Sequence, residues 1–104
     1  CHDCQRRSGS AFAAQIRFPV DRIEIGGVYR SWTRISDNGR KAFQHFCPEC
    51  GSTLFYDIEA MPGLRAVTMG AFAGTDLPAP CASIYESRRL PWVEITGTGI
   101  EHHD

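Results

Sequence analysis

Short segments of alternating apolar and polar residues follow one another along most of the chain. The clearest examples are RIEIGG (22–27), VYRSWTRIS (28–36) and KAFQHF (41–46). A period of two is typical of strands that bury one face. Turn residues separate the later apolar-rich segments, which are STLFYDI (52–58), LRAVTMGAF (64–72), CASIYES (81–87) and WVEIT (92–96). Strands at this spacing predict a mostly β fold.

Asp37-Asn38-Gly39 lies between two of these strands and predicts a hairpin, because Asn and Gly tolerate a positive φ. The segment AFAAQIRF (11–18) precedes Pro19, which favours extended backbone at its end. A helix has no obvious place except near Ser10–Ile16. The final EHHD could be a frayed tail or a remnant of cloning, and we assign its histidines no role. The chain has no internal linker, so we expect one domain over residues 1–104.

The composition is ordinary for a globular protein, with 42% hydrophobic and 22% charged residues. A net charge of −1 gives no electrostatic reason to expect a nucleic acid or an anionic membrane as partner. No apolar run reaches the roughly 18–20 residues that span a bilayer. The sequence starts with Cys rather than Met and shows no signal peptide. We therefore expect a missing N-terminal segment and a cytoplasmic location.

Cysteine usage carries most of the chemical information. Four of the five cysteines form two Cys-x-x-Cys pairs, CHDC at the start and CPEC in the middle of the chain. In a chain without secretory signals, such pairs are more typical of thiolate metal ligands than of disulfides. The sequence therefore predicts bound zinc.

The pair Cys47 and Cys50 is the stronger zinc signal. A two-residue spacer lets two thiolates reach one tetrahedral zinc, Pro48 fixes a turn, and Gly51 permits a positive φ. The flanking strands predict that this zinc knuckle lies at the tip of a β-hairpin. The alternative is a thioredoxin-like redox pair, but that motif lies at the start of a helix, and STLFY favours a strand.

The pair Cys1 and Cys4 has the same spacing, although it could also be a disordered terminal stub. From spacing alone, the four cysteines would close one structural site of the form C-x2-C-x42-C-x2-C. The alternative ligands are His2 and His45. Each is more often a surface histidine or one that supports a ligand by a hydrogen bond.

Taken as a set, four motifs resemble the glutathione-dependent formaldehyde-activating enzyme family, which also includes centromere protein V. The motifs are C-x-x-C-Q-R-R-S-G-S-A-F, F-C-P-E-C-G-S-T-L-F, V-T-M-G-A-F-A-G-T-D and S-x-x-L-P-W, and together they extend from Cys1 to about Trp92. The resemblance implies an Mss4-like fold, in which coiled antiparallel sheets carry zinc at hairpin tips.

The resemblance also implies two zinc sites. In the family, an upstream C-x-C joins the later Cys-x-x-Cys in a structural site, and a separate C-x-C-x-x-C holds a catalytic zinc with a position open for glutathione sulfur. Cys47 and Cys50 match half of the structural site. Cys1 and Cys4 match the last two cysteines of the catalytic motif, whose first cysteine would lie two residues before Cys1.

The implied function is that of a zinc-dependent carbon–sulfur lyase, which converts glutathione and formaldehyde to S-hydroxymethylglutathione or acts on a related thiol–aldehyde adduct. The alternative is a non-catalytic zinc-binding structural or interaction domain of the same fold. The expected partner is a small thiol such as glutathione. A sheet-rich domain with edge strands is also compatible with a homodimer.

Five further residues have both a functional and a structural interpretation. We expect Cys81 to be a small buried apolar side chain, with a redox role or service as a replacement ligand as the alternative. Arg88 and Arg89 could bind an anionic group such as a glutathione carboxylate, or be solvated in a loop. We expect Trp32 and Trp92 to be core or sheet-face aromatics.

Overall fold

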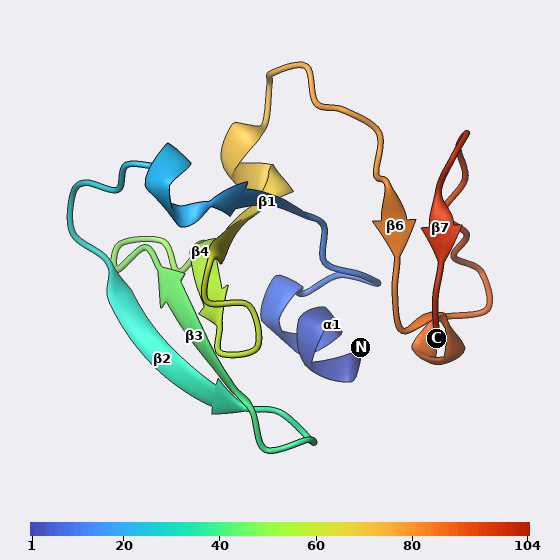
Figure 1. The fold of residues 1–104 in the computed structure, drawn as a ribbon, viewed down its shortest axis with the longest axis horizontal. Coiled ribbons are helices and arrows are strands. Elements are labelled where there is room, and N and C mark those ends of the chain that lie inside the picture. Colours follow the sequence, from blue (N-terminus) through green and yellow to red (C-terminus); the bar gives the residue numbers. More distant parts are fainter. The chain divides into compact units, whose positions relative to one another are not determined.

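The computed structural model describes residues 1–104, and most of its regular structure is β (Figure 1). The elements in chain order are α1 (His2–Ser8), β1 (Gln15–Pro19), η1 (Val20–Arg22), β2 (Arg30–Ile35), β3 (Lys41–Phe46), β4 (Thr53–Ile58), β5 (Leu64–Thr68), η2 (Met69–Phe72), β6 (Ala82–Ser83), η3 (Glu86–Arg88) and β7 (Glu101–His102). The three η elements are short 3-10 helices. The prediction of a mostly β fold is confirmed.

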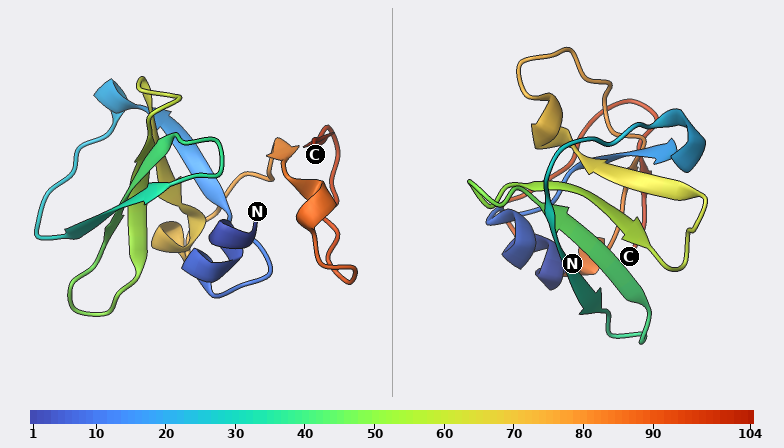
Figure 2. Two further views of the ribbon diagram at one scale, coloured as in Figure 1. Left: turned by 90° about the horizontal axis from the view of Figure 1, so that it is seen from below. Right: turned by 90° about the vertical axis from the view of Figure 1, so that its left-hand side faces the viewer.

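The chain divides into two compact units. The sheet unit is Ala14–Ala73, and the end unit combines Cys1–Ala13 with Gly74–Asp104. The sheet unit contains a five-stranded sheet in the order β1-β5-β4-β3-β2, in which every neighbouring pair is antiparallel (Figures 1 and 2). Consecutive hairpins build β2 to β5, and β1 adds to the outer edge of β5.

The hairpin predicted on either side of Asp37-Asn38-Gly39 is confirmed. Strands β2 and β3 pair along their whole length, from Arg30 opposite Phe46 to Ile35 opposite Lys41. The turn is closed by the Gly39 N–H, which donates to the Ser36 carbonyl at 2.8 Å. Gly39 has φ 82°, a conformation that a side chain would strain.

The prediction of a strand over residues 22–27 is wrong, because no strand lies between η1 and β2. Strands β1 and β2 are the two edges of the sheet, so the segment between them must cross from one edge to the other and cannot pair with either. A strand needs a neighbour for its backbone hydrogen bonds, and this segment has none. Its residues instead border a cavity of about 340 Å³ over the sheet, together with Leu54, Phe55 and Val67.

The core of the sheet unit lies on its central strands. In β3, Ala42 and Gln44 are buried and Phe43 is exposed, as expected for a strand with one covered face. Phe55 and Tyr56 are the largest buried side chains, at 6% and 8% exposure. Burying an aromatic side chain of this size contributes roughly 1.5–3 kcal/mol, so β4 anchors the sheet.

The end unit begins with the helix α1, and the prediction of a helix near Ser10–Ile16 is wrong. Asp3 lies in its first turn, and Arg6 and Arg7 lie in its last, which favours the helix dipole at both ends. Gly9 ends the helix in a left-handed conformation with φ 61°. The helix therefore ends where the sequence suggested that one would start.

Glu101 and His102 form a strand, so the final EHHD is not the frayed tail that was one of its two interpretations. Strand β7 lies beside β6 in a parallel pair (Figure 1). The Glu101 N–H donates to the Cys81 carbonyl at 3.0 Å, and the His103 N–H donates to the Ser83 carbonyl at 2.8 Å. Only two residues of the predicted 81–87 strand are therefore paired.

The predicted 92–96 strand is absent. The Val93 N–H donates to the Leu90 carbonyl at 3.0 Å, which makes a turn, and no strand lies beside the segment. Val93 is nevertheless buried at 8% exposure. The alternation of apolar and polar residues over 92–96 therefore reflects side-chain burial and not hydrogen bonding to a neighbouring strand. None of the helices has the length and apolar character that a bilayer-spanning segment needs.

Candidate functional site

Cys1 and Cys4 lie together at the start of α1. The Cys1 side chain is the N-cap, and its sulfur accepts a hydrogen bond of 3.3 Å from the Cys4 backbone N–H. The two sulfur atoms are 2.7 Å apart, and both residues are half-buried. The first pair is therefore a preformed set of two thiols on a helix, and not the disordered stub that was one alternative.

A cavity of about 50 Å³ lies next to this pair within the end unit. Cys1 and Gln5 border it from α1, and Tyr85, Arg88 and Arg89 border it from the region around η3. Its remaining lining is Ala11, Phe12, Ser83, Glu86, Val93 and Ile95. One of the predicted metal ligands thus faces space that a small molecule could enter.

Several contacts hold the wall of this cavity in place. The Gln5 amide donates to the Arg88 carbonyl at 3.2 Å, which ties α1 to η3. Tyr85 has φ 57° and is the only non-glycine residue with a positive φ. Such backbone strain tends to occur at functional sites. The Arg88 guanidinium lies over the Tyr85 ring, 5.8 Å from its centre.

Glu86 also borders the cavity, and a histidine from β7 holds it. His102 Nδ1 lies 2.7 Å from Glu86 Oε1. This hydrogen bond, with a further one from the Ser83 hydroxyl, lowers the pKa of Glu86 below its ordinary value. The carboxylate is therefore charged and already paired at neutral pH.

Cys47 and Cys50 lie in the turn of the β3–β4 hairpin, as predicted. The Cys47 N–H donates to the Ser52 carbonyl at 2.9 Å, and the Gly51 N–H donates to the Cys47 carbonyl at 2.9 Å. Gly51 has φ 75°, which the turn requires. Strands β3 and β4 continue from the turn on both sides, which argues against the helix start of a thioredoxin-like redox pair.

The environment of Cys50 favours its thiolate. Cys50 Sγ lies 3.1 Å from the Ser52 hydroxyl, which can turn to donate a hydrogen bond to a charged sulfur. The pKa of Cys50 is lowered mainly by this hydroxyl, then by the Ser52 backbone N–H and by Cys47. A thiol that ionises readily is a better metal ligand, because metals bind the thiolate.

Each unit therefore supplies one pair of thiols. Neither unit gathers three or more histidine, cysteine, aspartate or glutamate side chains in an arrangement that could hold a metal ion. The donor chemistry still fits zinc, because cysteine sulfur is a preferred zinc ligand and each pair would provide half of a tetrahedral set. Two observations support this fit, namely the 2.7 Å separation of the Cys1 and Cys4 sulfur atoms and, in the other pair, the lowered pKa of Cys50.

The remaining residues that the sequence singled out differ in how far the structure agrees with the predictions made for them. His2 is exposed on α1. Cys81 is exposed, so the expectation of a buried apolar side chain is wrong. Trp32 is 57% exposed on β2 and is a sheet-face aromatic, as predicted. Trp92 is 76% exposed outside any strand, so the prediction that it lies in the core or on a sheet face is wrong.

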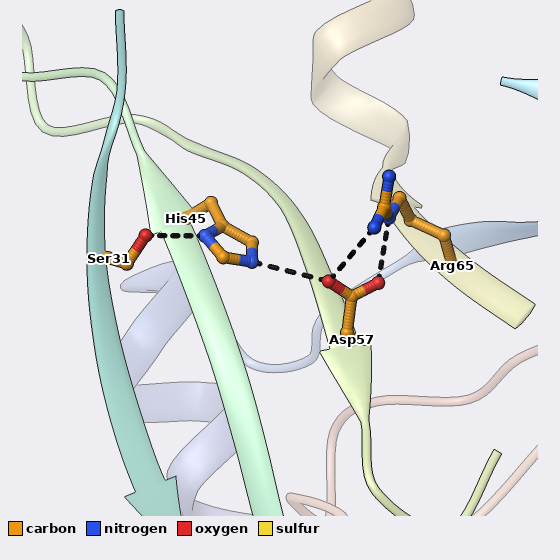
Figure 3. A network of polar contacts seen from close by, with 4 residues as sticks. All are labelled: Ser31, His45, Asp57 and Arg65. Carbon is orange, nitrogen blue, oxygen red and sulfur yellow. Dashed lines mark hydrogen bonds and ion pairs between the residues drawn. The ribbon is translucent and has the colours of Figure 1, made fainter. Parts of the chain in front are cut away.

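His45 belongs to a polar network on one face of the sheet (Figure 3). Its Nδ1 lies 2.6 Å from the Ser31 hydroxyl, and its Nε2 lies 3.4 Å from Asp57 Oδ2. Asp57 in turn accepts hydrogen bonds from Arg65 at 2.7 and 3.3 Å. The ring of His45 also stacks on Phe55, with centroids 4.3 Å apart. The network occupies both nitrogens of His45, which disfavours this residue as a metal ligand.

Sequence reasoning missed this network and the Glu86–His102 pair. The register places Ser31 opposite His45, and Asp57 opposite Arg65, so each pairing follows once the strands are aligned. The strand pattern alone does not give that register across loops. For the Glu86–His102 pair, the only sequence signal was the presence of histidines in the final EHHD, to which the sequence gave no role.

The fold and the thiols define a mostly β protein that carries one Cys-x-x-Cys at a helix start and another in a hairpin turn. Comparison with models of known families matches residues 1–88 to the glutathione-dependent formaldehyde-activating enzyme family. Because the match covers most of the 104 residues, the chain belongs to this family. No curated protein sequence matches the chain.

Proposed function

We propose that the protein is a zinc-dependent carbon–sulfur lyase that joins glutathione and formaldehyde to S-hydroxymethylglutathione, or acts on a related thiol–aldehyde adduct. In this proposal residues 1–104 form a single zinc-binding domain with an Mss4-like fold, which works in the cytoplasm, where thiols stay reduced. Family membership supports the glutathione-dependent chemistry.

The observation that carries the proposal is the position of Cys1 at the edge of a cavity. In the proposed site Cys1 and Cys4 are ligands of the catalytic zinc, and Cys47 and Cys50 are ligands of a structural zinc. A structural zinc site is closed, whereas a catalytic one keeps a position open to a small molecule. The first thiol pair borders such a cavity through Cys1.

The reaction forms one carbon–sulfur bond. The sulfur of glutathione adds to the carbonyl carbon of formaldehyde, the π electrons move to the oxygen, and that oxygen takes up the proton that the thiol gives up. Bound zinc lowers the pKa of a coordinated thiol and so supplies a thiolate at neutral pH. The end unit would orient the thiol and hold the rest of the substrate beside Cys1.

Adduct formation can be measured directly on the zinc-loaded protein. Glutathione and formaldehyde are mixed with the protein, and NMR exchange spectroscopy follows the formation of S-hydroxymethylglutathione. We expect an exchange rate above that of the spontaneous reaction, and a return to the spontaneous rate in Cys4→Ser. A rate equal to the spontaneous one in the zinc-loaded protein would exclude this reaction.

A second candidate is a zinc-binding structural or interaction domain without catalysis. It is favoured by the position of Cys47 and Cys50 in a tight hairpin turn, since this spacing is typical of closed structural zinc sites. Zinc content distinguishes the two functions. One tightly held zinc with four sulfur ligands favours the structural domain, whereas two zincs, one of which exchanges readily, favour the enzyme.

A further inference from the structure

We propose that Cys1 and Cys4 are a redox-active dithiol, which small disulfides convert reversibly to an intramolecular disulfide. The reactant belongs to the class of low-molecular-weight disulfides, and its products are two free thiols. The inference goes beyond the proposed function, because it concerns electron transfer at two sulfur atoms and needs neither bound zinc nor an aldehyde.

The two sulfur atoms are placed for a bond to each other. They lie 2.7 Å apart and belong to free thiols. A disulfide needs a sulfur–sulfur bond of about 2.05 Å, and cysteines whose Cβ vectors point apart cannot form one without backbone movement. Because the sulfurs of Cys1 and Cys4 are already in contact, the pair can close by a small movement of the two side chains.

Backbone hydrogen bonds hold Cys1 in this position. The Cys4 N–H donates to Cys1 Sγ at 3.3 Å, and the Gln5 N–H donates to the Cys1 carbonyl at 3.1 Å. The Gln5 amide also donates to the Arg88 carbonyl at 3.2 Å, which ties the first turn of α1 to η3. Groups that a fold orients in this way react with each other as if they were present at a very high concentration.

The cavity next to the pair determines which sulfur meets the reactant. Cys1 borders this cavity of about 50 Å³, and Cys4 does not. A water molecule occupies roughly 10–15 Å³ of such space, so the cavity admits one sulfur of a small disulfide with its neighbouring carbon. Cys1 is therefore the attacking thiol, and Cys4 is the thiol that closes the disulfide.

The reaction balances in two exchange steps. The Cys1 sulfur attacks one sulfur of the reactant, whose sulfur–sulfur bond breaks, so that a mixed disulfide forms and one thiolate leaves. The Cys4 sulfur then attacks the Cys1 sulfur and releases the second thiolate. Each released thiolate takes up the proton that a cysteine gives up, and two electrons pass from the cysteine pair to the reactant.

The oxidised pair cannot hold a metal. Metals bind the thiolate form of cysteine, and a closed disulfide offers no thiolate. Oxidation would therefore release a zinc ion held by Cys1 and Cys4, and a bound zinc ion would protect the two sulfurs from oxidation. The pair has two mutually exclusive states, one that can bind metal and one that is oxidised.

Cys81 provides an internal reference for the reaction. It is exposed and lies in the same unit as the pair. It is also the one cysteine outside the two Cys-x-x-Cys motifs. A small disulfide can modify Cys81, but the exchange should stop there at the mixed disulfide, because no nearby cysteine in the sequence completes a pair.

Disulfide closure can be measured without aldehyde. The folded, zinc-loaded protein is equilibrated with millimolar glutathione and glutathione disulfide, with and without a chelator that removes exchangeable zinc, and circular dichroism confirms the fold. Acid quenching, alkylation and peptide mass spectrometry then identify the state of each cysteine. We expect the closed Cys1–Cys4 disulfide to exceed the mixed disulfide at Cys1 by about tenfold or more, since the effective concentration of the two sulfurs is well above millimolar. If Cys81 is modified while the pair stays open in every folded form, the inference is overturned.

Variants assign the roles of the two sulfurs. We expect Cys4→Ser to accumulate the mixed disulfide at Cys1, because the closing thiol is missing. Cys1→Ser should keep the helix, since serine is a good N-cap, and should modify Cys4 more slowly than Cys4→Ser modifies Cys1. The matched control Cys81→Ser should close the pair as the unaltered protein does. A Cys4→Ser variant that forms no mixed disulfide at Cys1 would overturn the attacking role of Cys1.

The unfolded chain is a second control, because a Cys-x-x-Cys segment can also close without a fold. In concentrated urea we expect the ratio of closed to mixed disulfide to fall by about tenfold or more, since the contact between the sulfurs is lost. Equal ratios in the folded and the unfolded chain would show that the fold does not place the sulfurs for exchange, which would overturn the inference.

The outcomes separate this inference from the proposed reaction. If the pair closes and reopens while the zinc-loaded protein shows no adduct formation, the redox activity stands and the proposed lyase reaction is wrong. If adducts form and the pair does not close, the reverse holds.

Discussion

The Asp57 carboxylate accepts a hydrogen bond of 2.7 Å from Nε of Arg65 on the neighbouring strand, and the two residues oppose each other in the β4–β5 register. Both side chains are less than one-third exposed. The same carboxylate lies 3.4 Å from Nε2 of His45, so a single acidic group joins three strands of the sheet (Figure 3).

We expect Asp57→Asn to lower the free energy of unfolding by about 1–2 kcal/mol, because a charge-assisted hydrogen bond is lost and Arg65 keeps an unpaired charge. Urea unfolding of Asp57→Asn, Arg65→Gln and the double variant gives the coupling energy. A double variant that loses the full sum of the two single effects would show that the two residues do not interact.

The Glu86–His102 pair predicts a pH dependence of stability. The His102 hydrogen bond lowers the pKa of Glu86, so the folded protein holds the proton of this group less readily than the unfolded chain. The stabilisation is therefore present above the ordinary pKa of about 4.3 and is lost as the pH falls through the lowered value.

Glu86→Gln should accordingly melt below the unaltered protein at pH 6, and the two melting temperatures should converge as the pH falls below about 4. Thermal melts between pH 3 and pH 6 measure this. Glu94→Gln is the control, because Glu94 is exposed and does not border the cavity. Parallel curves for Glu86→Gln and the unaltered protein would contradict the prediction.

Loss of either hairpin thiol should unfold the protein if the proposed structural zinc is present. In small zinc domains the free energy of metal binding is part of the free energy of folding. We expect Cys47→Ser or Cys50→Ser to abolish the cooperative melting transition and the native circular dichroism spectrum. The control Cys81→Ser changes an exposed thiol outside both pairs and should melt normally. A Cys50→Ser variant that keeps its melting temperature would show that no structural metal is held there.

The first thiol pair should behave differently. Serine is a good N-cap and can replace the Cys1 side chain at the start of α1. We therefore expect Cys1→Ser to keep the fold within about 0.5 kcal/mol but to lose readily exchangeable zinc and adduct formation. Native mass spectrometry counts the metal in each variant. A Cys1→Ser variant with unchanged zinc content would remove Cys1 from the proposed catalytic site.

The turn around the second pair depends on a backbone conformation as well as on sulfur. Gly51 has φ 75°, and a methyl group there would meet nothing within 4 Å, so the cost of Gly51→Ala is strain alone. We expect a loss of about 1–2 kcal/mol. Gly63→Ala is the matched control, since Gly63 has open space and no positive φ in the left-handed range. Similar stabilities for the two variants would contradict the assignment of strain.

The β2–β3 and β3–β4 hairpins were predicted from the sequence, whereas the N-terminal helix α1 was not. Asn38-Gly39 and the alternation on either side of it are local signals, and the β2–β3 hairpin is a local structure. For α1 the relevant signals were also local, namely Asp3 early, Arg6 and Arg7 late, and Gly9 after them.

Other errors came from features that are not local. Residues 22–27 alternate like a strand, but sheet order makes them cross between two edges, and that order depends on pairings far along the chain. The cavity beside Cys1 needed the same kind of information, because it joins Cys1 to Arg88 and Arg89. No local pattern could bring these residues together.

The end unit is built from two separate segments of the chain, which has a consequence for folding during synthesis. Residues 14–73 are contiguous and can form their contacts as soon as they leave the ribosome. The end unit instead joins the first 13 residues to the stretch from Gly74 onward, and its last backbone hydrogen bonds involve His103. The Cys1 and Cys4 thiols therefore leave the ribosome well before the residues from Gly74 onward that complete their surroundings, and during that interval metal ions and oxidants would have their easiest access to them.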